Sequence, residues 1–216
     1  MSYDPHYHPY SSYRVPVYAK KGMVSTSQPL AAHAGLDILK KGGNAIDAAI
    51  ATAASLTVLE PASNGIGGDA FALVWTNNQL YGLNASGPSP QSISIDALKE
   101  KGYRDIPKDG MIPFTVPGAP AAWAALSKRF GKLPLSQVLQ PAIQYAKEGF
   151  PLASTLAKQW KQAYDTFKRV HTSEEFESWF QTFAPNGRAP KAGEMLSSIH
   201  GKKIKRCLWS RLFHPT

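Results

Sequence analysis

Residues 48–59, AAIATAASLTVL, contain no charged side chain and only three hydroxyl-bearing ones. The stretch has the length of a helix and presents small or apolar residues on every face, which predicts a helix buried on all sides. Asn44 precedes it as the expected N-cap, and Asp47 lies three residues further on, near the positive helix end. The predicted helix therefore covers residues 44–59.

The preceding segment predicts an amphipathic helix that begins at Ser27 or Gln28 and ends at residue 41, before Gly42-Gly43. Its polar positions share one stripe, and we expect His33 to pair with Asp37 at the surface. Residues 22–26 are interpreted as a short strand.

The stretch EPASNGIGGDAFALVW, residues 60–75, has three glycines in four positions, Gly65, Gly67 and Gly68. We interpret them as a corner that requires positive φ and close backbone approach before a buried strand at residues 70–75. The residues after that strand predict a turn at 76–79 and a return strand at 80–83, forming a hairpin. A phosphate-binding loop is disfavoured, because such loops run from strand to helix and carry Gly-Lys-Ser/Thr.

The remaining pattern predicts mainly helices and loops. Helices are expected at residues 92–100, 120–130, 135–148 with a bend at Pro141, 154–167 and 173–180; loops are expected at 84–90 and 104–118, and a turn at Asn186-Gly187. Aromatic residues recur at helical spacing between residues 160 and 180. We interpret them as core rather than as a ligand-binding cluster.

The charge is concentrated at one end of the chain. The formal charge of the 216 residues is +9, and five Lys or Arg without an acid lie between residues 201 and 216, so 9 − 5 = +4 remains for residues 1–200. The body shows no clustered basic face of the kind that nucleic-acid binding requires. We therefore expect no nucleic-acid partner.

Cys207 is the single cysteine, so an intramolecular disulfide and a cysteine-based metal site are excluded. His6 and His8 lie in a Tyr- and Pro-rich start that we interpret as a loose arm, and no metal is expected. No signal peptide and no run of about 18 apolar residues is present. We expect a cytoplasmic protein without a membrane partner.

The chain contains four linked motifs: Gly22-Met23-Val24, the segment from Ala34 to Ala49 with GGNAIDAA, the segment from Glu60 to Gly68, and Pro117-Gly118 before a helix. In this order they resemble the N-terminal part of the γ-glutamyltransferase (γ-glutamyltranspeptidase) family. The resemblance covers about residues 17–195. A lone GxGG would be unspecific, whereas four linked motifs are specific.

The resemblance implies an α+β fold of the N-terminal nucleophile hydrolase class, an αββα sandwich that would be incomplete in this fragment. It also implies a precursor that cleaves itself to free a threonine, whose hydroxyl is the nucleophile and whose α-amine is the base. Family members transfer or hydrolyse a γ-glutamyl group through an acyl-enzyme, without a cofactor. The implied partners are a small γ-glutamyl or acyl-amide substrate and the missing small subunit.

Two departures from the family pattern concern the site. The nucleophile belongs to the small subunit beyond residue 216, so we expect no catalytic residue in this chain and no activity from it alone. The family's substrate-binding arginine follows the second hairpin strand, four residues before a proline; Pro88 fits that proline, and Asn84 holds the position. Asparagine cannot form the charge-assisted contact that an arginine makes with a carboxylate. We therefore expect a different acyl group, as in acylase-like branches of the family.

The expected organisation is an N-terminal arm (1–20), a large-subunit-like part (21–195) and a basic tail (196–216) unlike the family. Family-like sequence stops after Gly193-Glu194, and we expect a truncation by frameshift. The alternative is a non-catalytic binding or structural module, or pseudoenzyme, derived from the family. We consider it less favoured, because a helix at 44–59 without its usual cover would expose an apolar surface.

Overall fold

A computed structural model describes residues 16–107, 110 and 112–197 of the chain. Its elements, in order, are α1 Pro29–Lys40, α2 Ala45–Leu59, β1 Ala70–Thr76, β2 Gln79–Ala85, α3 Ile95–Glu100, α4 Ala119–Phe130, α5 Leu135–Val138, α6 Gln140–Glu148, β3 Phe150–Pro151, α7 Ser154–Val170, a 3-10 turn Glu174–Phe176, α8 Glu177–Phe183 and β4 Met195–Leu196. This is the expected α+β mixture. In the described part, the strands form two separate two-stranded sheets, β1-β2 and β3-β4.

Helix α2 is the centre of the fold. It contacts α1, α4, α5 and α6. Among its residues only Ala45 and Ala49 are exposed, which confirms the predicted buried helix. The helices that cover α2 belong to this chain itself. A stand-alone module would therefore not leave α2 uncovered, and the expectation that it would is wrong.

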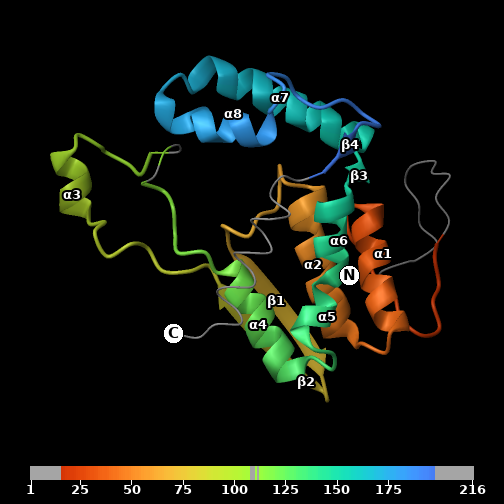
Figure 1. Ribbon diagram of the computed structural model, residues 1–216. Helices are drawn as coiled ribbons and strands as arrows, with labels where there is room; N and C mark the ends of the chain where they lie inside the picture. The colour runs from red at the N-terminus through yellow and green to blue at the C-terminus, as the bar shows by residue number, and fades with distance from the viewer. Residues whose placement is uncertain (1–15, 108–109, 111, 198–216) are drawn as a thin grey trace.

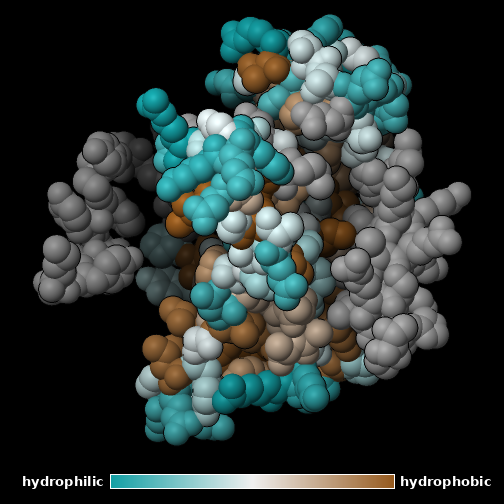
Figure 2. Space-filling view, turned by 90° about the vertical axis from the view of Figure 1, so that its left-hand side faces the viewer, coloured by the Kyte–Doolittle hydropathy of each residue, from teal (hydrophilic) through white to brown (hydrophobic). Residues whose placement is uncertain are grey.

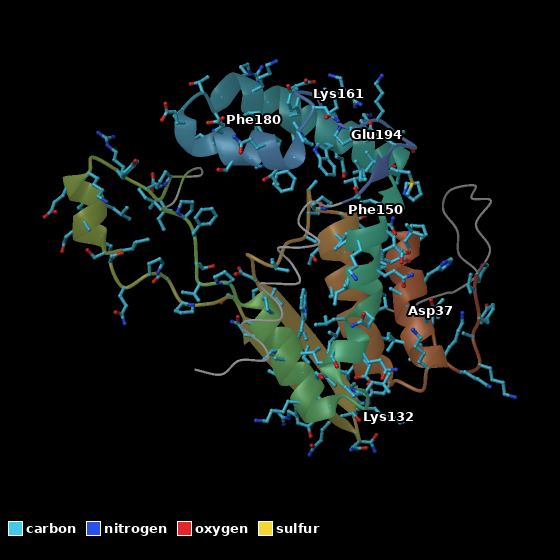
Figure 3. The ribbon with its side chains drawn as sticks, in the orientation of Figure 1. Asp37, Lys132, Phe150, Lys161, Phe180 and Glu194 are labelled. Atoms are coloured by element: carbon cyan, nitrogen blue, oxygen red, sulfur yellow. The ribbon has the colours of Figure 1, made fainter. Side chains whose placement is uncertain are left out.

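The N-terminus of α2 is held by a capping box. The Asn44 side chain accepts the N–H groups of Ile46 and Asp47, each at 3.0 Å, and the Asp47 carboxylate accepts the Asn44 N–H at 3.0 Å. Asp47 is fully buried and also accepts the backbone N–H groups of Lys132 and Leu133. Figure 3 marks Lys132 at this end of the molecule. The carboxylate thus fastens α2 to the turn between α4 and α5.

Helix α1 packs closely along α2. A Cβ at Gly35 would collide with the Thr52 side chain and lie 3.1 Å from the Ala48 carbonyl oxygen, so glycine permits the close approach. Asp37 forms an exposed ion pair with Lys40 at 3.2 Å, instead of the predicted pair with His33.

Residues 22–26 are extended but belong to no strand, so the predicted strand is wrong. A strand requires a neighbour for its backbone groups, and no described strand lies alongside this segment.

The predicted hairpin is confirmed. Strands β1 and β2 pair antiparallel from Ala70↔Ala85 to Thr76↔Gln79, and the turn residues Asn77 and Asn78 have φ of 51° and 59°. Positive φ at both central residues is typical of a type I′ turn, in which asparagine is favoured.

The expected burial of β1 is wrong for one of its faces. Val74 is 7% exposed, whereas Phe71, Leu73 and Trp75 are 67–78% exposed. Side chains alternate between the faces of a strand, and the described helices cover only one of them. On the side of the molecule shown in Figure 2, hydrophobic surface gathers low, where the hairpin lies.

The C-terminal half follows the predicted helices. The predicted bend at Pro141 is a break between α5 and α6 at Leu139, two residues before the proline. Helices α7 and α8 form an antiparallel pair above the other helices, and α3 lies apart at the end of a long loop (Figure 1). The Trp160 indole N–H donates to the Phe183 carbonyl at 2.9 Å and joins α7 to α8. Trp160 is buried, as expected of core, whereas the other aromatic residues of the predicted group, Tyr164, Phe176, Trp179 and Phe180, are only half-buried.

Strand β4 joins the end of the described chain to the fold. Leu196 pairs with Phe150 and packs against the buried cluster that contains Leu59, Phe150 and Trp160. The first residue assigned to the tail is therefore part of the packed structure. Residues 1–15 of the predicted arm, with His6 and His8, and residues 198–216 of the tail, with Cys207, lie outside the described residues.

Candidate functional site

The glycine corner connects α2 to β1 and has a different basis from the one predicted. Gly65, Gly67 and Gly68 all lack positive φ, and a Cβ at Gly67 would meet no atom within 4 Å. The turn is instead formed by the N–H groups of Ser63 and Asn64, which donate to the Glu60 carbonyl at 3.0 Å. The prediction that these glycines need positive φ and close packing is therefore wrong.

The glycines that permit close backbone approach are Gly87 and Gly118. Gly87 has φ of +72°, and a Cβ there would collide with the Val116 carbonyl; a Cβ at Gly118 would collide with the Ala85 carbonyl. The Val116 N–H donates to Pro88 at 3.0 Å. These contacts close the base of the loop at residues 86–117. Each glycine is followed or preceded by a proline, a turn signal that could have identified both.

The corner is attached to the same loop base. The N–H groups of Gly118 and Ala119 donate to the Gly68 carbonyl at 3.0 and 3.1 Å, and Thr115 Oγ1 donates to Asp69 at 3.4 Å. The corner, the free end of the hairpin and the start of α4 thus meet at one place.

Asn84 lies at this end of the hairpin, inside β2 and opposite Phe71. It is exposed, and its register places it on the same face as Phe71 and Leu73. Its Oδ1 accepts the Ser86 N–H at 3.0 Å, which leaves the Nδ2 donor without a partner among the described residues. Asn84 is thus a neutral donor on an apolar, solvent-exposed sheet face.

The corner also borders a cavity of about 560 Å³, which extends from the corner to the α7–α8 pair. Its walls come from the end of α2, the corner, β3, α7, α8 and the segment leading through β4. The lining residues are Thr57, Val58, Pro61, Asn64, Gly65, Ile66, Gly67, Phe150, Trp160, Thr182, Phe183, Pro185, Asn186, Arg188, Pro190, Glu194, Met195, Leu196 and Ser197. In Figure 3, Phe150 and Glu194 mark the side where β3 and β4 meet.

The charged side chains of the lining neutralise each other. Arg188 donates to both Glu194 carboxylate oxygens, at 3.0 and 3.3 Å, and the Lys191 N–H donates to Glu194 at 2.9 Å. The hydrogen bond from Arg188, followed by that from Lys191, lowers the pKa of Glu194 below its ordinary value. The same pairing raises the pKa of Arg188. This ion pair closes the segment that forms one wall of the cavity.

The described residues contain neither a metal-binding cluster nor a helix able to cross a membrane. Within residues 16–107, 110 and 112–197, no group of three or more His, Cys, Asp or Glu could hold a metal ion. Across the same residues, no helix is both long and apolar enough to cross a membrane.

The sequence model of the gamma-glutamyltranspeptidase family matches residues 31–200. The chain belongs to this family. The match continues beyond residue 195, where the sequence pattern had indicated that family-like sequence stops. The predicted family resemblance is thus confirmed.

Among curated relatives in the γ-glutamyltranspeptidase family, the chain is 37% identical over 181 residues to the glutathione hydrolase-like YwrD proenzyme of Bacillus subtilis, covering 82% of this chain and 33% of that protein. It is 39% identical over 152 residues to the acylase ACY 1 proenzyme of a Pseudomonas strain, covering 66% and 27%. The chain therefore spans about a third or less of the curated relatives that it matches.

Solved structures of the family have the same fold. The cephalosporin acylase from Bacillus halodurans is 57% identical, with a TM-score of 0.88, over 99% of this chain and 41% of that one. The Helicobacter pylori gamma-glutamyltranspeptidase is 27% identical, with a TM-score of 0.78, over 94% and 59%. The fold is therefore that of the N-terminal nucleophile hydrolases, represented here by an incomplete part.

Proposed function

We propose that the chain is the N-terminal, large-subunit part of an enzyme that transfers or hydrolyses the acyl group of small amides. The observation that carries this proposal is the match of residues 31–200 to the family, with both a glutathione hydrolase-like protein and acylases among the relatives. The relatives are named glutathione hydrolase-like or acylase, and the position of Asn84 selects between these two kinds of acyl group.

The proposed chemistry needs a part of the protein beyond residue 216. A threonine at the start of a small subunit attacks the amide carbonyl, and its α-amine takes the hydroxyl proton and returns it to the leaving amine. Water or an acceptor amine then releases the acyl group from the threonine. Residues 1–216 contribute no catalytic group to these steps, so this chain alone is inactive.

The exposed hairpin face is the proposed contact with that missing part. Phe71, Leu73, Trp75 and Leu80 are 61–78% exposed, and the strand register places them on one side of the hairpin. Burial of apolar surface contributes about 25 cal/mol per Å². Packing of further strands on this face would therefore stabilise the sandwich and bring the nucleophile near Asn84.

Asn84 is the proposed substrate-binding residue of this chain. A γ-glutamyl group carries an α-carboxylate, for which a guanidinium is the stronger partner. Asn84 offers a neutral N–H donor beside the apolar Phe71 and Leu73. The proposed acyl group is therefore one without an α-carboxylate, bound by its apolar body and one hydrogen-bond acceptor.

The test uses the polypeptide encoded by this sequence together with the coding sequence downstream of it. We expect a higher kcat/KM for phenylacetyl anilide than for γ-glutamyl anilide, and we expect Asn84→Arg to shift this ratio toward the γ-glutamyl substrate. Gln79→Arg, at the turn end of β2, is the matched control, since Gln79 is exposed and the substitution adds the same charge at the opposite end of the hairpin. A ratio that Asn84→Arg leaves unchanged would remove Asn84 from the site.

One observation favours a second candidate, a non-catalytic module. The chain's own helices α1, α4, α5 and α6 cover α2, so the helical part has a core without a partner. The large exposed apolar face of the hairpin argues against it. A monodisperse monomer of residues 1–216 with a cooperative melting transition would support the module.

A further inference from the structure

The cavity between the corner and the α7–α8 pair has walls that are mainly apolar. Phe150, Trp160 and Phe183 contribute aromatic side chains, and the first two are 3% and 9% exposed. The volume of about 560 Å³ is within the range of small-molecule sites, about 300–1,000 Å³. Such walls suit an aromatic or branched aliphatic group.

The glycine corner gives the cavity a polar edge. Gly65 and Gly67 line it, and their backbone N–H groups donate to no residue within the described part of the chain. A Cβ at Gly67 would meet nothing within 4 Å, so the space beside its Cα is open. A backbone N–H that no protein group accepts can bind the carbonyl oxygen of a ligand.

The lining also contains neutral side chains that both donate and accept. Asn64 and Asn186 carry amide groups, which complement an amide N–H as well as a carbonyl. The ionised groups of the described lining, Arg188 and Glu194, already pair with each other. This pair carries no net charge, so the described lining offers no excess charge that would attract a charged ligand.

We propose that this cavity binds a neutral amide that carries an aromatic or branched aliphatic group. The ring lies against Trp160, Phe183 and Phe150, and the amide lies at the corner. The site is defined by residues of this chain alone, so its binding can be measured without turnover. The acyl amides of the proposed function belong to this ligand class, but the inference stands on the cavity itself.

The probe is para-fluorophenylacetamide, followed by fluorine NMR with the purified chain 1–216. We expect line broadening and a saturable shift with a dissociation constant of about 1 mM, as for a ligand of this size. The matched anionic probe is para-fluorophenylacetate. We expect weaker binding of the acetate, since the one cationic side chain of the described lining, Arg188, already pairs with Glu194.

Two variants test the corner. Gly67→Ala places a methyl group in the open space, and Gly65→Ala places one 3.9 Å from the Gly67 nitrogen. We expect each to weaken binding about tenfold. Gly82→Ala in β2 is the control, because glycine there has only an ordinary contact with Leu73 and lies outside the cavity. Melting curves identify any variant that fails to fold, and the other variant then carries the test.

The proposal predicts amide binding that both corner variants weaken and Gly82→Ala does not. Absence of amide binding to the folded chain, or equal binding by all variants, would overturn the site. Tighter binding of the acetate would overturn the neutral ligand class. Loss of turnover in the complete protein would bear on the proposed function instead, so the two failures are distinguishable.

Discussion

Both carboxylate oxygens of Asp47 accept the backbone N–H of Lys132, at 3.2 and 3.1 Å, across 85 positions of the sequence. The same buried side chain accepts the N–H groups of Asn44 and Leu133. One residue thus caps the central helix and fixes the turn that carries α4 into α5.

Asp47→Ala leaves these partly buried N–H groups without their acceptor. Each unsatisfied buried group costs about 1–3 kcal/mol, so we expect the free energy of unfolding to fall by about 3 kcal/mol or more. Urea unfolding measures the change. Asp37→Ala is the control, because it removes an exposed ion pair and should cost less than about 1 kcal/mol. Equal effects of the two substitutions would contradict the role assigned to Asp47.

Replacement by alanine should change the free energy of unfolding differently at Gly87 and Gly118 than at Gly67. At Gly87 or Gly118 the new Cβ would collide with a backbone carbonyl, so we expect a loss of about 3 kcal/mol or more. At Gly67 the Cβ meets open space without positive φ. There we expect no loss, and a gain of up to about 1 kcal/mol through the unfolded state. Thermal melting of the three variants compares them directly; similar losses at all three would refute the assignment.

The segment at residues 188–194, which forms one wall of the cavity, should lose stability at acid pH. Hydrogen bonds from Arg188 and then from Lys191 lower the pKa of Glu194 below its ordinary 4.5. A carboxylate with a lowered pKa in the folded state stabilises that state above the ordinary value, and this contribution is lost as the pH falls through the lowered value. We therefore expect the Lys191 amide to lose protection from hydrogen exchange in that range.

Glu194→Gln should remove this pH dependence by lowering protection already at neutral pH. Asp165→Asn, at an exposed ion pair on α7, should leave the Lys191 amide unchanged. Protection that persists in the Gln variant would show that the ion pair does not hold the segment.

The exposed face of the hairpin should govern the association of the isolated chain. Leu73 is 78% exposed, so Leu73→Lys should reduce self-association without loss of stability. Static light scattering measures the change. Val74→Lys, on the opposite and buried face, is the contrasting variant and should unfold the hairpin region. If Leu73→Lys leaves association unchanged, the apolar face is not responsible for it.

Local signals in the sequence predicted most of the secondary structure. The run at 48–59, the cap at Asn44 and the asparagines at 77 and 78 each determine their conformation through neighbours in the sequence. The prediction failed where a partner decides the outcome. Residues 22–26 have the composition of a strand but no described strand beside them, and Phe71, Leu73 and Trp75 have apolar character but no cover.

The site was predicted less completely than the fold. The family motifs identified the corner and the position of Asn84, but the physical role given to Gly65, Gly67 and Gly68 was wrong. The cavity joins the corner to residues 182–197, more than a hundred positions away, and no local pattern encodes that approach. Its ion pair, Arg188 with Glu194, depends on the turn at 186–187 and on the pairing of β4 with β3.

We propose that residues 1–216 form one part of an acyl-transferring enzyme whose nucleophile lies elsewhere. Intact mass spectrometry tests this on the polypeptide encoded by this sequence and its downstream coding sequence, after incubation with phenylacetyl anilide. We expect two polypeptides, with the acyl adduct on the downstream one and none on residues 1–216. An acyl adduct on residues 1–216, or turnover of the anilide by that chain alone, would contradict it.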